Sequence, residues 1–190
     1  MDLAEAAGGG AQEQGVREFP DLLESIWSSP KPIVAVVRGP ARAGGVGLLA
    51  ACDVVVAAES ATFAFSEVRL GLVPAVISAV VLPRMVPHVA HRLMLTGNVF
   101  DAATAETGGL VDLVVPDADV DGELRAQLVE LTAGAPAALA ETKRLLRAGT
   151  TLRFDGLLEL SARFFASEEG QEGIASFREK RPARWVPQAD

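Results

Sequence analysis

The sequence predicts an α/β protein in which strands and helices alternate at first and helices alone follow. Short apolar runs rich in valine, typical of strands buried on both faces, occupy residues 33–37, 54–58 and 110–115. Between these runs apolar residues recur at helical spacing, and beyond them no further strand pattern appears. We therefore expect an α/β core over residues 1–118 and a helical C-terminal region over residues 119–190.

Most elements carry a local signal at their start or end. Residues 1–14 are small and acidic and are expected to form a loop, and residues 62–65 are expected to form a further strand. One helix is expected to stop at Gly97, and Asp101 is placed to cap the next. The expected helices span residues 16–27, 46–51, 90–96, 102–106, 124–131, 136–147, 151–166 and 171–178.

Composition narrows the class of protein. A chain of 190 residues with 49% hydrophobic residues can bury a sizeable core. The excess of 25 acidic over 17 basic side chains disfavours a nucleic-acid partner, and the single Cys52 excludes an internal disulfide. The acidic start does not resemble a signal peptide, and prolines interrupt the longest apolar run, residues 70–83. We therefore expect a cytoplasmic protein with no membrane partner.

A glycine corner is the main candidate for a functional element. Gly44 and Gly45 follow the strand at 33–37 and precede the helical segment 46–51. At such a corner backbone N–H groups are unpaired and a ligand can approach closely, so the site suits a phosphate or a reaction oxyanion. No lysine follows to make a Walker loop, and the match of the corner to a dinucleotide fingerprint is weak. A tight turn without a ligand is the remaining interpretation.

Several further stretches stand in one order around this corner. They are Lys31–Gly39, Ala43–Leu48 with Cys52-Asp53, Phe63–Pro74, Leu95-Thr96-Gly97, Gly109–Asp112 and Phe177–Arg181. Together they resemble the enoyl-CoA hydratase/isomerase (crotonase) superfamily over nearly the whole chain, with matching spacing. The resemblance implies a crotonase-like α/β fold with a β-β-α spiral core and an enzyme that acts on acyl-CoA thioesters.

The resemblance also implies roles for individual residues. The backbone N–H of Gly44 would be a donor of the oxyanion hole, and Glu67 would be the catalytic acid and base. An apolar setting should raise the pKa of Glu67, whereas the alternative interpretation is an exposed glutamate paired with Arg69. Ala43, Gly45 and Pro74 are expected to contact the substrate. Lys180 matches a C-terminal lysine that helps to hold CoA.

Two positions depart from the pattern of the family. Many hydratases carry a second glutamate three residues after the oxyanion glycine, where this chain has Gly47. The segment that supplies the other oxyanion donor would precede Met1, which implies an N-terminally incomplete core. A misassigned start, a truncated gene and a degenerate family member would each explain this. Arg42, just before the glycines, either meets the phosphates of CoA or lies at a solvated rim.

The expected function is hydration of 2-enoyl-CoA thioesters. The alternatives are an enoyl-CoA isomerase or decarboxylase that uses Glu67 alone, a relative linked to acyl carrier protein, and an inactive acyl-CoA-binding member. The resemblance implies no metal and no redox cofactor, because CoA is part of the substrate. It further implies assembly into a homotrimer or homohexamer through the helical C-terminal region.

Overall fold

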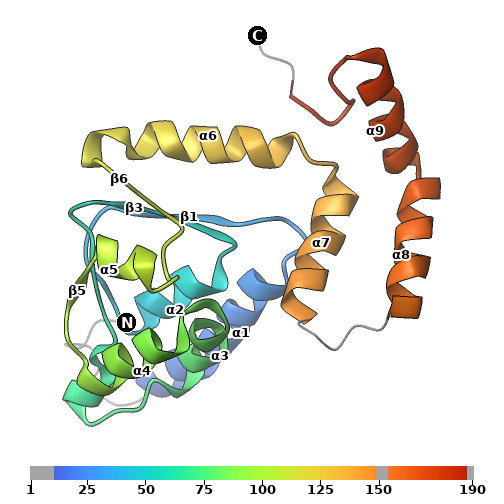
Figure 1. Ribbon diagram of the computed structural model, residues 1–190. Helices are drawn as coiled ribbons and strands as arrows, with labels where there is room; N and C mark the ends of the chain where they lie inside the picture. The colour runs from blue at the N-terminus through green and yellow to red at the C-terminus, as the bar shows by residue number, and fades with distance from the viewer. Residues whose placement is uncertain (1–10, 149–153, 188–190) are drawn as a thin grey trace. The chain divides into compact units, whose positions relative to one another are not determined.

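The computed structural model describes residues 11–148 and 154–187 (Figure 1). The chain divides into two compact units, a first unit that holds residues 33–124 together with the helix before them, and a second unit made of residues 29–32 and 125 onward. The elements are α1 (Ala11–Ser28), β1 (Val34–Val37), β2 (Ala41–Arg42), α2 (Gly44–Ala51), β3 (Val54–Ala58), β4 (Thr62–Ala64), the 3₁₀ helix η2 (Ser66–Leu70), α3 (Ala75–Arg84), α4 (Pro87–Thr96), β5 (Phe100–Asp101), α5 (Ala102–Thr107), β6 (Leu113–Val115), the 3₁₀ helix η3 (Asp117–Asp119), α6 (Val120–Thr132), α7 (Pro136–Ala148), α8 (Phe154–Ala166) and α9 (Glu168–Glu179).

The larger sheet explains the valine-rich runs. Its strand order is β1-β3-β6 and both pairings are parallel, with Val34 opposite Val54 and Val56 opposite Leu113. Alternate residues of β3 contact different clusters. Val55 and Ala57 join the main core with α2 and α3, whereas Val56 joins a smaller cluster with Val120 of α6. Because both faces are covered, the strands are apolar at consecutive positions rather than at every second one.

The position of Val120 explains where the first unit ends. The first turn of α6 packs on the sheet through this buried residue, so the compact unit runs to Leu124. The sequence placed the change from mixed to helical structure at residue 118. The helices of the expected C-terminal region are all present as α6 to α9, although residues 151–153 of the expected third one lie outside the described residues.

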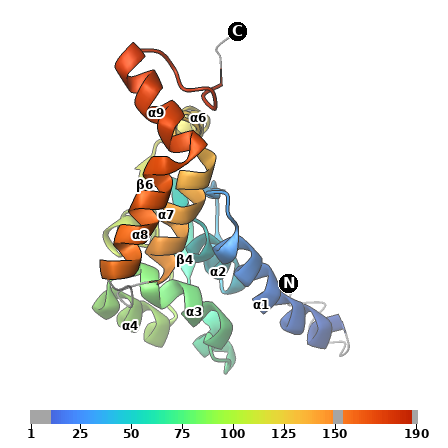
Figure 2. The same cartoon turned by 90° about the vertical axis from the view of Figure 1, so that its right-hand side faces the viewer.

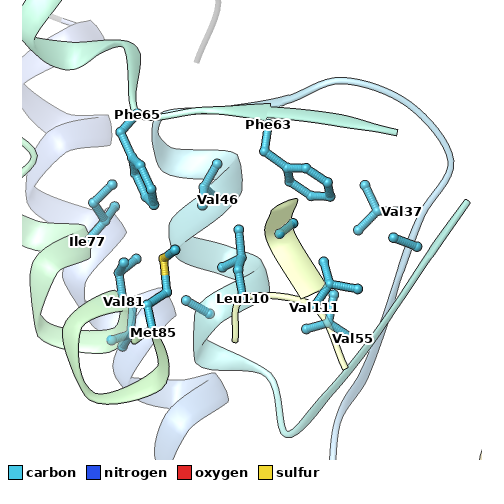
Figure 3. Close-up of a cluster of buried hydrophobic side chains, with 14 of the residues drawn as sticks. Val37, Val46, Val55, Phe63, Phe65, Ile77, Val81, Met85, Leu110 and Val111 are labelled. Atoms are coloured by element: carbon cyan, nitrogen blue, oxygen red, sulfur yellow. The ribbon is translucent and has the colours of Figure 1, made fainter. Parts of the chain in front are cut away.

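The main core of the first unit lies between the larger sheet, α2 and α3. Figure 3 shows Val46 of α2 at its centre, with Phe65 and Ile77 on one side and Phe63 and Val55 on the other. All five side chains are at most 3% exposed. Since α2 is apolar on every side, it serves as the buried helix around which the other elements of the unit pack.

A second, smaller sheet was not expected in full. It has the order β2-β4-β5, with β2 parallel and β5 antiparallel to β4. The sequence predicted the strand at residues 62–65, but β2 and β5 are two residues long and carry no periodic pattern. Phe100 of β5 stacks on Phe63 and Phe65 at centroid distances of 5.7 and 5.9 Å, which ties this sheet to the core.

Four further expectations concern local structure. Gly97 ends α4 in the left-handed conformation, and the Asp101 side chain accepts a hydrogen bond from the Thr104 N–H at 2.8 Å, as predicted. Residues 11–14 are helical rather than part of a loop, because α1 begins at Ala11; residues 1–10 lie outside the described residues. The expected strand at 110–115 is a strand only from Leu113.

Arg84 explains why that strand starts late. Its guanidinium donates to the carbonyl oxygens of Leu110 and Cys52, both at 2.9 Å, and pairs with the carboxylate of Asp112. The same carboxylate accepts from the Val55 N–H at 2.7 Å. The Leu110 and Val111 N–H groups donate to the Ala105 carbonyl oxygen of α5, at 2.9 and 3.2 Å, and the first backbone hydrogen bond to β3 comes from the Asp112 N–H. The segment before β6 is therefore held by α5 and Arg84, and it joins the sheet only from Asp112 onward.

The second unit is built from helices. Residues of α7 and α8 face each other across a mainly apolar cavity of about 270 Å³. Helix α9 follows α8 after a turn (Figure 2), and the Ser167 side chain in this turn caps α9. Helix α8 has no buried residue among those described, and its Leu158 and Phe165 are 73% and 66% exposed. In the described part of the chain no helix is both long and apolar enough to span a bilayer.

An ion pair between the buried Glu172 and the partly exposed Arg181 stabilises the end of the second unit. Glu172 of α9 is 8% exposed and accepts hydrogen bonds from two guanidinium nitrogens of Arg181, at 2.7 and 3.0 Å, and from the Arg184 N–H at 2.9 Å. Chiefly the hydrogen bonds of Arg181 lower the pKa of Glu172 from 4.5 to about 2. The carboxylate is thus stabilised in its charged form, which fastens the segment after α9 to the helix.

We expect Glu172→Gln to lower thermal stability at neutral pH and to have little effect near pH 2. Because the folded-state pKa lies below the unfolded value, the stabilisation is fully present above pH 4.5 and is lost as the pH falls toward 2. Melting temperatures of both proteins between pH 2 and 7 would measure this. A difference that does not shrink below pH 4.5 would contradict the assignment.

Candidate active site

The glycine corner has the geometry expected of an anion site. After β2 the chain turns at Ala43, whose φ of 46° and ψ of −117° are unusual for a residue other than glycine, and α2 begins at Gly44. Among the described residues, no acceptor lies within hydrogen-bond distance of the Gly44 N–H or the Gly45 N–H. Two backbone donors at the start of a helix are therefore available to a ligand.

The surroundings of the two glycines differ. A Cβ on Gly44 would lie 3.2 Å from the ring of Phe19 in α1, so α1 covers that side of the corner. A Cβ on Gly45 would meet nothing within 4 Å. The open side of the corner is therefore at Gly45, where the absence of a side chain leaves space for a ligand to reach the backbone.

Glu67 is the buried carboxylate that the sequence predicted. It lies in η2, three residues after β4 ends, and is 9% exposed. Its Oε2 atom is buried and has no hydrogen-bond partner among the described residues. Burial raises the pKa of Glu67 above its ordinary value of 4.5, and a hydrogen bond from its own backbone opposes this in part. Because buried polar atoms nearly always have a partner, an unpaired carboxylate oxygen is a sign of a ligand site.

The alternative interpretation of Glu67 is wrong. It required an exposed carboxylate paired with Arg69. The Arg69 guanidinium instead donates to the carbonyl oxygen of Thr96 at 2.7 Å and to the side chain of Asn98 at 2.6 Å. The two charged residues of η2 therefore have different surroundings.

Strand pairing brings the corner and the carboxylate to one end of the small sheet. In the parallel pair β2 and β4, Arg42 is opposite Ala64, and the Ala43 N–H donates to the Ala64 carbonyl oxygen at 3.0 Å. Gly44 follows β2 by two residues and Glu67 follows β4 by three. Since parallel strands end at the same edge, both turns leave the sheet there.

Arg42 reinforces this pairing. Its guanidinium donates to the carbonyl oxygen of Thr62 at 2.7 Å and to the Thr62 hydroxyl at 2.9 Å. From the sequence, Arg42 was expected either to meet the phosphates of CoA or to lie at a solvated rim. The structure instead gives Arg42 a role in joining β2 to β4.

Gly47 has no room for a side chain. An added Cβ would lie 2.4 Å from Cγ2 of Ile77, which is 3% exposed. Figure 3 shows Ile77 in the interior next to Phe65. Position 47 lies one helical turn after Gly44, on the same face of α2. Ile77 therefore fills the space in which a carboxylate from position 47 would have to begin.

The remaining predicted contacts lie in different places. Pro74 directly precedes α3, after a segment in which Leu72 and Val73 are 54% and 78% exposed. Lys180 ends α9 in the second unit, with a φ of 54° and an exposed side chain. The structure thus brings Ala43, Gly44, Gly45 and Glu67 to one edge, and it describes Lys180 only within its own unit.

The site lacks the features of a metal centre. Among the residues that the structure describes, no three His, Cys, Asp or Glu side chains cluster in a way that could hold a metal ion. Sequence analysis missed the contacts of Arg69 and Ile77 with other elements. Both depend on residues far away in the chain, and no local pattern could reveal them.

Unpaired amides at a glycine corner and a buried, unpaired carboxylate thus lie at one sheet edge, an arrangement suited to oxyanion stabilisation and acid–base chemistry. The sequence profile of the enoyl-CoA hydratase/isomerase family matches residues 1–188. A relative from Thermus thermophilus with enoyl-CoA hydratase in its name is 39% identical over 168 residues, which cover 86% of this chain and 66% of the relative. The chain belongs to the enoyl-CoA hydratase/isomerase family.

Solved structures agree with this assignment. A Legionella pneumophila enoyl-CoA hydratase/isomerase (crotonase) superposes with a TM-score of 0.87 at 35% identity, over 96% of this chain and 73% of that protein. An enoyl-CoA hydratase from Shewanella pealeana gives 0.86 at 34% identity, over 96% and 71%. The fold is therefore crotonase-like, as predicted, and this chain spans two thirds to three quarters of the length of these relatives.

We expect Gly47→Ala to lower the free energy of unfolding by about 1–3 kcal/mol, because the new methyl group overlaps Ile77. In the double variant Gly47→Ala/Ile77→Ala, the loss in the free energy of unfolding should be smaller than the sum of the two single losses, because Ile77→Ala removes the overlap. Denaturant unfolding would measure both. Gly122→Ala is the control, because a Cβ there meets nothing within 4 Å. Additive costs, or a stable Gly47→Ala, would contradict the steric argument.

Proposed function

We propose that this protein is an enoyl-CoA hydratase that adds water across the double bond of a 2-enoyl-CoA thioester. The observation that carries the proposal is the buried Glu67 carboxylate, with its unpaired Oε2, at the same sheet edge as the unpaired Gly44 N–H. Membership of the family and the names of its relatives support the reaction class.

The proposed chemistry begins at the carbonyl of the thioester. The Gly44 N–H donates a hydrogen bond to the carbonyl oxygen and stabilises the negative charge that develops there. Glu67 takes a proton from water as the water oxygen bonds to C3, and the π electrons of C2=C3 pass toward the carbonyl oxygen. The protonated Glu67 then delivers a proton to C2, the enolate electrons form the C–H bond, and the carboxylate is restored.

The raised pKa of Glu67 suits both steps of this sequence. A carboxylate in water is a weak base near neutral pH, whereas burial makes its charged form less stable and its proton affinity higher. The same group is therefore a stronger base toward water and still an acid toward the enolate. The space at Gly47, which Ile77 fills, offers no second carboxylate to share these roles.

The proposal includes further contacts with the substrate. Ala43, Gly45 and Pro74 contact the acyl thioester, and Lys180 contacts the CoA moiety. No metal and no redox cofactor takes part, and the protein acts in the cytoplasm as a homotrimer or homohexamer. The exposed apolar side chains of α8 support assembly through the second unit.

The closed space at Gly47 favours a second candidate, the shift of a double bond. Abstraction of a proton at one carbon and its return at another need only one base, which Glu67 supplies. A decarboxylase would use the same enolate and the same Gly44 donor. These reactions and hydration thus differ in substrate and in the use of water.

Assays with two thioesters separate the candidates. We expect loss of the 2-enoyl-CoA absorbance as water adds, with formation of a 3-hydroxyacyl-CoA identified by mass. Turnover of a 3-enoyl-CoA without hydration of the 2-enoyl-CoA would establish the isomerase instead. Tight binding of both thioesters without turnover would favour an inactive acyl-CoA-binding protein.

We expect Glu67→Gln to abolish turnover while the Kd for the acyl-CoA changes by less than about threefold, because the amide keeps the size of the side chain and loses its basicity. Its thermal stability at pH 7 should be equal or higher, since the variant removes a buried unpaired charge. Calorimetric binding and melting curves supply these readouts. Retained turnover would remove Glu67 from the reaction.

A further inference from the structure

The side chain of Arg69 connects the turn that carries Glu67 to the end of a distant helix by hydrogen bonds. Arg69 lies two residues after Glu67 in η2, and its two hydrogen bonds reach the end of α4, at Thr96 and at Asn98 just beyond it. Among the described residues no carboxylate lies within 4 Å of this guanidinium. Its charge is instead directed at the carbonyl end of a helix, where a cation is favoured.

The contact between η2 and α4 is close. Gly97 follows α4 with a φ of 61°, and its N–H donates to the Leu93 carbonyl oxygen at 3.0 Å. A Cβ on Gly97 would lie 2.8 Å from Cγ of Arg69 and 3.2 Å from the carbonyl oxygen of Phe65. The carbonyl oxygen of Phe65, two residues before Glu67, and the aliphatic part of the Arg69 side chain thus both lie close to this glycine.

At the other end of the turn, the hydrogen bonds that the structure describes lie within the turn's own backbone. The Leu72 N–H donates to the Glu67 carbonyl oxygen at 3.0 Å, and the Gly71 N–H donates to the Val68 carbonyl oxygen at 3.4 Å. Beyond it the chain enters the exposed segment before α3. A five-residue 3₁₀ helix is a weak element by itself, so its position depends on side-chain contacts.

We infer that Arg69 is a positioning residue for Glu67: its hydrogen bonds to Thr96 and Asn98 hold η2 against the end of α4 and thereby keep the Glu67 carboxyl buried at the edge beside Gly44. The role rests on the proposed function of Glu67. Arg69 touches neither substrate nor reacting atoms, and its effect passes through the backbone of the turn.

The burial of Glu67 makes this role testable by titration. Burial raises the pKa of the Glu67 carboxyl, a hydrogen bond from its own backbone lowers it, and no charged side chain among the described residues shifts it. If the turn loosens, water reaches the carboxyl and its pKa falls toward 4.5. A substitution that only lowered the global stability would leave this pKa unchanged in the folded protein.

The test compares Arg69→Met with Arg92→Met. Arg92 lies on α4 itself, is exposed, and forms no side-chain hydrogen bond with the described residues. Arg92→Met therefore makes the same change of charge and side-chain size as Arg69→Met without removing a hydrogen bond. Glutamate labelled with ¹³C at the carboxyl carbon reports the protonation of Glu67, which Glu67→Gln assigns. We expect the Glu67 pKa to fall toward 4.5 in Arg69→Met and to stay at its wild-type value in Arg92→Met.

Kinetics supply the second readout. Arg69→Met should reduce kcat about 10- to 100-fold with KM within about twofold, since displacement of a catalytic group costs rate more than binding. Asn98→Ala, which removes one of the two hydrogen bonds, should shift both readouts in the same direction by less. The Glu67 pKa and the kcat of Arg69→Lys should lie between those of the wild type and those of Arg69→Met.

The outcomes separate this inference from the proposed function. An unchanged Glu67 pKa in both Arg69→Met and Asn98→Ala would overturn the positioning role, whatever the enzyme turns over. If the wild-type protein shows no hydratase activity but the Glu67 pKa still falls in Arg69→Met, the positioning role stands and the proposed function is overturned. If Arg69→Met does not fold, the Asn98→Ala titration decides.

Discussion

The parallel pairing of β2 with β4 is the constraint on which the candidate site depends. The pair is short, with Arg42 opposite Ala64 and one further hydrogen bond from the Ala43 N–H to the Ala64 carbonyl oxygen. It decides where two turns begin, because parallel strands release their chains at the same edge. The amide of Gly44 and the carboxyl of Glu67, 23 positions apart in the sequence, are both within three residues of that edge. An antiparallel pairing would have separated them.

Burial then gives this edge its chemical character. The stacked phenylalanines of the small sheet and the wholly apolar helix α2 form the interior behind the two turns. In that setting the Glu67 carboxyl has a raised pKa and an unpaired oxygen, which a folded protein tolerates only at a cost in stability. Ile77 is part of the same interior, and its contact with Gly47 leaves no room for a carboxylate at position 47. The apolar packing therefore also limits which side chains can line the candidate site.

The sequence predicted the elements with strong local signals and missed those without one. The Val54–Ala58 strand, the helix end at Gly97 and the cap at Asp101 follow from β-branched runs, a left-handed glycine and an N-cap side chain. The two-residue strands β2 and β5 have no period to detect, yet β2 is the strand that positions Gly44. Resemblance to the family supplied Glu67 and Gly44 as candidates. The surroundings of Arg69 and Ile77 come from packing between distant segments, which one sequence does not encode locally.

The proposed reaction requires that one thioester contacts both the amide of Gly44 and the carboxyl of Glu67. A crystal structure with a bound, unreactive acyl-CoA analogue would show whether it does. We expect the thioester oxygen about 2.7–3.1 Å from the Gly44 nitrogen, with the acyl carbons C2 and C3 in reach of the Glu67 carboxyl. A thioester bound away from the Gly44 nitrogen, or one whose acyl carbons lie out of reach of Glu67, would contradict it.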